Sequence, residues 1–297
     1  MQKIAKPHSF KFEKSKLSAL AWGDKDAPLW IALHGWMDNS ASFIRIAPII
    51  ASNLKVRIIA IDFSGHGLSR HRPPRSEYSM WSYCHDVLDA LEELGNPVVT
   101  LLGHSLGAGV ANILAAIYPD SIKGIVLIDG LLGRLIEPEN LINQLRDGIS
   151  GQRRALPSEK RYQCVEEAIN LRVQKSLLPI TPCTVGSIVT RSLSGNSQNG
   201  YKFTIDRQIA TPRPVAFTQA QATAILSGIK CPCLLIQGTQ GIVPKRDTNH
   251  SCRDSIKRLT IIELEGGHHL HLAKGSADTV AAEIVAWHKQ HYDEIQC

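Results

Sequence analysis

The sequence feature that most constrains the fold is a serine flanked by glycines, between a buried strand and a helix. An apolar run at residues 98–102 leads into Gly103-His104-Ser105-Leu106-Gly107, and a helical segment follows at 110–118. A tight strand-to-helix turn strains its central residue, so the residues two positions away must lack side chains that would clash. The turn would hold the Ser105 hydroxyl at a helix N-terminus, where partial positive charge favours a developing anion. The pattern therefore predicts that Ser105 is a nucleophile.

Short apolar runs alternate with helical segments along most of the chain. The expected strands are residues 29–33, 56–61, 98–102, 125–128, 233–237 and 259–264, and the expected helices are 40–52, 78–94, 110–118 and 279–291. Residues 9–22 are typical of a two-stranded hairpin. Apolar strands that alternate with helices predict an α/β fold with a mostly parallel central sheet and helices on both faces.

Residues 131–229 interrupt this alternation. They hold helical pieces at 158–175 and 184–193, a polar Gly/Ser/Asn loop at 194–200, and two prolines, Pro212 and Pro214. We therefore expect a core domain made of residues 1–130 and 230–297, and a helical cap at 131–229 over the carboxyl ends of the strands. Five apolar side chains of this segment either line a pocket for an apolar substrate group or pack inside the cap: Leu141, Leu145, Ile169, Ile188 and Phe217.

A nucleophilic serine needs a base, because its own hydroxyl is barely ionised at neutral pH. His268 follows two glycines directly after the last expected strand, at the same end of the sheet as Ser105. It is therefore the predicted base, with His269 and His271 as competitors. A metal site from these three histidines is a weaker alternative, since neighbouring side chains point apart and no carboxylate pattern joins them; we expect no metal.

The base in turn needs a carboxylate to fix its tautomer and stabilise the imidazolium. Asp129 ends the apolar run 125–128, after the helix that follows Ser105, and is the predicted acid. A strand-end aspartate can also simply cap a turn. Asp247, in a loop after the run 233–237, stays open as an alternative acid, and Asp206 is expected to be structural.

Two backbone N–H groups are needed to hold the oxyanion of a tetrahedral intermediate. One is expected from Leu106, which follows the nucleophile, and the other from Trp36, where His34-Gly35 allows a sharp turn. Met37 is a further candidate for the pocket wall.

Composition and charge exclude several classes of protein. The chain has 297 residues with 33 Lys and Arg against 27 Asp and Glu, a net charge of +6 without a long basic run, so nucleic acid is not an expected partner. The sequence shows no transmembrane run, secretory leader or nucleotide-phosphate motif. Its seven scattered cysteines fit reduced thiols, which predicts a cytoplasmic location. No cofactor is expected, and the oligomeric state is open.

Together these motifs resemble the α/β-hydrolase superfamily, over nearly the whole chain. The resemblance is carried by His34-Gly35-Trp36, by residues 62–69 (DFSGHGLS), by residues 103–107 and by Gly266-Gly267-His268, and is greatest to the serine hydrolase-like branch. In such proteins Asp62 would shape a loop. Family members commonly carry the acid in a G-x-x-D-x-x-V-P pattern, whereas residues 238–244 (GTQGIVP) are one residue shorter and lack the aspartate. Many haloalkane dehalogenases carry it one strand earlier, at the position that Asp129 matches.

The resemblance implies a serine hydrolase that cleaves a carboxylic ester or related acyl substrate. Dehalogenases and epoxide hydrolases of this fold use a nucleophilic aspartate, so Ser105 argues against both. Two alternatives remain: a hydrolase that cleaves a carbon–carbon bond, opens a lactone or forms a peracid, and a non-enzymatic small-molecule receptor. The receptor is motivated by the missing late acid and by the basic, cysteine-containing segment at 131–229.

Overall fold

A computed structural model describes residues 6–156, 158–176, 178–243 and 252–292 of the chain. Its centre is an eight-stranded sheet with the order β1-β2-β4-β3-β5-β6-β9-β10. The strands are β1 (His8–Lys11), β2 (Ser18–Trp22), β3 (Leu29–Leu33), β4 (Arg57–Ile61), β5 (Val99–His104), β6 (Ile122–Ile128), β9 (Cys233–Gln240) and β10 (Leu259–Gly267). All neighbours from β4 to β10 pair in parallel, while β2 pairs antiparallel with both β1 and β4.

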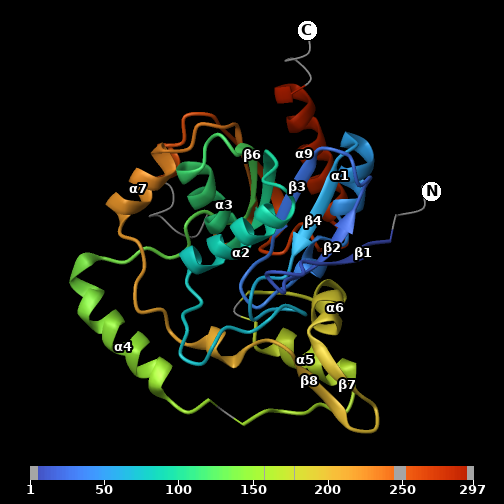
Figure 1. The fold of residues 1–297 in the computed structure, drawn as a ribbon, viewed down its shortest axis with the longest axis vertical. Helices are drawn as coiled ribbons and strands as arrows, with labels where there is room; N and C mark the ends of the chain where they lie inside the picture. Colours follow the sequence, from blue (N-terminus) through green and yellow to red (C-terminus); the bar gives the residue numbers. More distant parts are fainter. Residues whose placement is uncertain (1–5, 157, 177, 244–251, 293–297) are drawn as a thin grey trace.

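Helices cover both faces of this sheet, as the alternating pattern predicts. The helices α2 (Met80–Glu93), α3 (Leu106–Ile117) and α7 (Gln219–Ser227) pack on one face, and α1 (Ala47–Leu54) and α9 (Ala277–Tyr292) pack on the other (Figure 1). Side chains of β3 alternate between the two resulting cores: Ile31 and Leu33 face α2 and α3, whereas Trp30 and Ala32 face α1 and α9. The predicted α/β fold class is confirmed.

Within the described part of residues 131–229 there are four α-helices, two short 3-10 helices and a β-hairpin. The α-helices are α4 (Leu141–Arg153), α5 (Val165–Gln174), α6 (Pro182–Arg191) and α7, and the hairpin strands are β7 (Leu193–Asn196) and β8 (Gly200–Phe203). The polar stretch at 194–200, expected as a loop, is thus most of the first strand, the tip and the first residue of the second strand of this hairpin. Its Gly, Ser and Asn residues are typical of loops, and so short a strand pair has no apolar alternation to reveal it.

The segment with α5 and α6 contacts the carboxyl ends of β3 and β4. The Arg191 Nη2 of α6 lies 2.8 Å from the Asp62 Oδ2 that follows β4, and the Asn39 side-chain amide donates to the Ile188 carbonyl at 2.8 Å. Figure 1 shows α5, α6 and the hairpin together beyond one end of the sheet. By contrast α7 packs against α3, on a face of the sheet.

Every helix among the described residues is too short or too polar to cross a membrane.

Candidate active site

Ser105 occupies the strained turn that its glycine neighbours predict. It lies between β5 and α3 with φ 53° and ψ −109°, a conformation that costs a non-glycine residue on the order of 1–3 kcal/mol. Its amide donates to the Ile128 carbonyl of β6 at 3.1 Å, which anchors the turn to the sheet. A Cβ on Gly103 would lie 2.5 Å from the Gly107 carbonyl oxygen, and one on Gly107 would overlap the Leu33 carbonyl. These close approaches explain why glycines flank the serine at both positions.

Asp129 and His268 form a buried pair beside this turn. The His268 Nδ1 lies 2.6 Å from the Asp129 Oδ2, and the Asp129 side chain is fully buried. The aspartate directly follows β6 with φ 41°, and the histidine directly follows β10. A hydrogen bond of this length to Nδ1 leaves Nε2 as the ring nitrogen that can accept a proton.

The loop after β9 holds the Asp129 carboxylate by its backbone. The Ile242 amide donates to the Asp129 Oδ2 at 2.8 Å, and a Cβ on Gly241 would overlap the carboxylate. This is the loop that lacks the family's usual aspartate. The shorter loop therefore brings backbone donors to Asp129 where a side-chain acid would otherwise stand.

Of the other two aspartates considered from the sequence, the structure describes Asp206. Asp247 lies outside the described residues. Asp206 accepts a hydrogen bond from the Tyr78 hydroxyl at 2.6 Å and caps the following turn through the Gln208 amide, consistent with the structural role expected for it. Asp62 accepts bonds from the Ser40 and Leu68 amides, which shapes the loops after β3 and β4.

Trp36 and Leu106, the two expected oxyanion donors, both line the same cavity as Ser105. Leu106 is the first residue of α3, so its N–H has no partner one turn earlier within the helix. His34 stabilises the loop of Trp36, because its Nδ1 donates to the Gly35 carbonyl at 2.8 Å and its Nε2 accepts from the Phe63 amide at 3.0 Å.

The cavity has a volume of about 460 Å³ and is lined by Ser105, His268 and residues of both the sheet ends and the 131–229 segment. Its apolar wall is made by Met80, Leu131, Leu178, Ile209, Ile242 and Val243. The five apolar side chains named from the sequence, and Met37, do not line it. Ile169 packs within a small cluster of α5 and α6, and Phe217 packs on Trp81 with ring centroids 6.0 Å apart. The apolar side chains of Ile169 and Phe217 therefore serve packing.

A second polar network borders the site and was not expected from the sequence. Asp38 lies 3.2 Å from both the His269 Nε2 and the Arg172 Nη2, and 3.7 Å from the His104 Nδ1. Although burial opposes it, the adjacent His269, Arg172 and His104 hold the pKa of Asp38 well below its usual range. The ligand atoms of Asp38, His104 and His269 also lie within 4.8 Å of one another, as a metal site requires. Through these contacts Asp38, in the loop after β3, joins Arg172 of α5 to His269, which follows β10. The one sequence signal for this network was the group of histidines at 268–271.

Two buried histidines predict that the protein becomes less stable as the pH falls. Burial, reinforced by neighbouring histidines, lowers the pKa of His104 and His271 well below the usual 6.5. Below about pH 6.5 the unfolded chain therefore binds more protons than the folded one, and the free energy of unfolding should fall by about 1.4 kcal/mol per pH unit for each such histidine. Urea unfolding between pH 7 and pH 5 measures this slope.

A matched pair of variants tests the source of that slope. His271→Leu should reduce it, while the same change at the exposed His8 should leave it as in wild type. An unchanged slope in His271→Leu would contradict the assignment.

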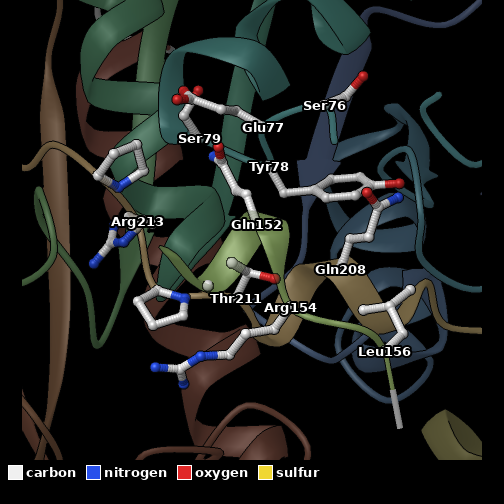
Figure 2. A pocket seen from close by; sticks show the side chains of 13 residues that line it. Ser76, Glu77, Tyr78, Ser79, Gln152, Arg154, Leu156, Gln208, Thr211 and Arg213 are labelled. Carbon is white, nitrogen blue, oxygen red and sulfur yellow. The ribbon is translucent and has the colours of Figure 1, made fainter. Parts of the chain in front are cut away.

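A smaller pocket adjoins the cavity on the side of α4. The two share Tyr78, Thr211, Pro212 and Arg213 in their walls. Figure 2 shows Arg154, just beyond α4, and Arg213 extending their guanidinium groups to the same side. The cavity of Ser105 thus adjoins a region lined by polar side chains, Arg154, Arg213 and Glu77.

Comparison with known proteins identifies the family to which this fold belongs. The family model described as alpha/beta hydrolase fold matches residues 28–274. A serine hydrolase-like protein of Dictyostelium discoideum is 31% identical over 283 residues, covering 88% of this chain and 76% of the relative. One from Danio rerio is 29% identical over 268 residues, covering 86% and 81%. A hypothetical protein of Pseudomonas aeruginosa PAO1, solved by crystallography, is 32% identical with a TM-score of 0.86, covering 95% and 99%.

Proposed function

This chain belongs to the α/β-hydrolase fold family, and its relatives named serine hydrolase-like proteins support the conclusion that it is a hydrolase. On that premise we propose that it is a serine hydrolase that cleaves carboxylic esters or related acyl compounds. The observation that carries the proposal is the 2.6 Å contact between the His268 Nδ1 and the Asp129 Oδ2, in a cavity that Ser105 also lines. The proposed catalytic residues are Ser105, His268 and Asp129.

In the first half of the proposed reaction, the Ser105 Oγ attacks the acyl carbonyl carbon while the His268 Nε2 takes its proton. Asp129 accepts the Nδ1–H bond and stabilises the imidazolium that forms. The Leu106 and Trp36 amides donate to the oxyanion. The tetrahedral intermediate then collapses, the bond to the leaving oxygen breaks, and His268 returns the proton to the departing alcohol.

In the second half, water attacks the acyl-Ser105 carbonyl and gives a proton to His268. Collapse releases the carboxylic acid, and the proton returns to the Ser105 oxygen. Each step uses groups of this chain and water.

We further propose that residues 131–229 act as the cap over this site. The cavity wall supports this, since Arg134, Arg172, Leu178 and Thr211 of this segment line it together with Ser105. The contact of Arg191 with the buried Asp62 fastens the segment to the loops beside the site. A cap of this kind determines which substrates reach the nucleophile.

Trapping of the acyl intermediate tests the function. We expect p-nitrophenyl acetate and butyrate to yield p-nitrophenol and the free acid. Acid quenching during the first turnovers should reveal protein heavier by one acyl group, located by peptide mass spectrometry on Ser105. Absence of both turnover and acylation across an ester panel would favour the receptor alternative.

Product identification separates the remaining chemistries. Preferential ring opening of lactones, peracid formation with hydrogen peroxide, or cleavage of a carbon–carbon bond would redirect the proposal to those reactions. The Asp129–His268 contact favours the enzyme over the receptor, because it offers a carboxylate in place of the one whose absence from residues 238–244 was one of the two motives for the receptor.

A further inference from the structure

Cationic side chains from three separate parts of the 131–229 segment meet at the cavity of Ser105. They are Arg134, the pair Arg172 and Lys175, and Arg213. Among the described lining residues the one carboxylate is Asp38, which is already held by Arg172 and His269. Within the part of the chain that the structure describes, no carboxylate lies within 4.0 Å of a side-chain nitrogen of Arg134, Lys175 or Arg213. Among the described residues, the cavity therefore presents three cations that have no acidic partner.

Of the three cations, Arg213 has the surroundings that point most clearly to a bound anion. It stands between two prolines, Pro212 and Pro214, which restrict its backbone, and it lines both the main cavity and the smaller pocket (Figure 2). Burial lowers the pKa of its guanidinium from the usual value. Partial removal of a cation from water costs free energy unless an anion compensates for it. A bound anion would supply that compensation.

The charge of the chain is concentrated in the same segment. Residues 131–229 contain 12 Lys and Arg against 7 Asp and Glu, a net charge of +5 out of the chain's +6. A cleft lined by charges of one sign attracts ligands of the opposite sign and raises their local concentration. The excess positive charge of the chain therefore lies in the segment that contributes Arg134, Arg172, Lys175 and Arg213 to the cavity wall.

We propose that the substrate is an acyl compound that carries an anionic group, a carboxylate or a phosphate, bound by Arg213 with Arg134 and Lys175. This inference rests on the proposed hydrolase function and specifies its substrate class. The apolar wall of the cavity, including Met80, Leu131 and Val243, accommodates the chain that links the acyl carbonyl to the anion. Guanidinium groups suit this role, because their paired N–H donors match both carboxylate and phosphate oxygens.

Two pairs of substrates test the proposal and distinguish the source of the anion. The first pair compares p-nitrophenyl hydrogen glutarate with its neutral methyl ester, which places the charge on the acyl side. The second compares butyryl-coenzyme A with S-butyryl-N-acetylcysteamine, which lacks the phosphates of the leaving group. In at least one pair, wild-type kcat/KM should be roughly five- to tenfold higher for the anionic member. The preference should weaken as ionic strength rises.

Arg213→Met should reduce the preferred pair's ratio towards one, whereas Arg146→Met should leave the ratio as in wild type. Arg146 is an exposed residue of α4 that bonds Asn143 and lies outside the cavity wall, so it is a matched control. Equal kcat/KM values within both pairs, or an equal loss on both members in Arg213→Met, would overturn the inference while leaving the hydrolase function intact. Absence of Ser105-dependent turnover on all four substrates would instead mark failure of the proposed function.

Discussion

Replacing Ser105 with alanine is expected to lower kcat for p-nitrophenyl butyrate by roughly 10⁴- to 10⁶-fold, which is the scale of losses at serine nucleophiles. Alanine removes the Oγ that would form the acyl-enzyme and keeps the Cβ, so the turn between β5 and α3 should persist. The backbone bond from residue 105 to the Ile128 carbonyl is independent of the side chain. Steady-state kinetics at saturating ester measures the loss.

Two controls separate loss of chemistry from loss of structure. The thermal unfolding midpoint of Ser105→Ala should stay close to that of wild type. Ser52→Ala, a change of the same kind at an exposed position of α1, should keep full activity. Retention of activity within about tenfold in Ser105→Ala would remove this serine from the mechanism.

Replacing Asp129 with asparagine should lower kcat/KM by roughly 10³- to 10⁴-fold. Asparagine has nearly the same shape, but its NH₂ group can donate to the His268 Nδ1. It would then favour the tautomer whose Nε2 bears the proton, and that nitrogen could no longer accept one from Ser105. The loss of negative charge also removes stabilisation of the imidazolium. The ratio of kcat/KM for wild type and variant measures both effects together.

The same substitution elsewhere provides the comparison. Asp120→Asn, at an exposed position, should leave kcat/KM unchanged. If Asp129→Asn were active and Asp247→Asn were not, the acid would have to be reassigned to the loop after β9.

The sequence predicted the parts of this fold that depend on local patterns. Strand β5, the helix after it and the glycines around Ser105 follow from apolar runs and from close packing within one turn. Asp129 could be placed beside the site because parallel strands carry their carboxyl ends to one edge of the sheet.

Contacts between residues far apart in the sequence could not be predicted. The Asp38–Arg172 pair joins residues 134 positions apart, and no period or motif relates them. The residues of the cavity wall could not be predicted for the same reason. Ile169 and Phe217 were proposed for it because they are apolar, but in the structure they pack against other side chains. Arg213 lines the cavity instead. The expected cytoplasmic location stays a prediction.

The most direct test of the central claim is covalent labelling by a fluorophosphonate probe, followed by peptide mass spectrometry. The account predicts rapid labelling of wild type at one equivalent, located on Ser105. It also predicts loss of that rapid labelling in His268→Ala, because the base that activates the serine is gone while Ser105 remains. Failure of wild type to react, labelling of another residue, or unchanged labelling in His268→Ala would contradict it.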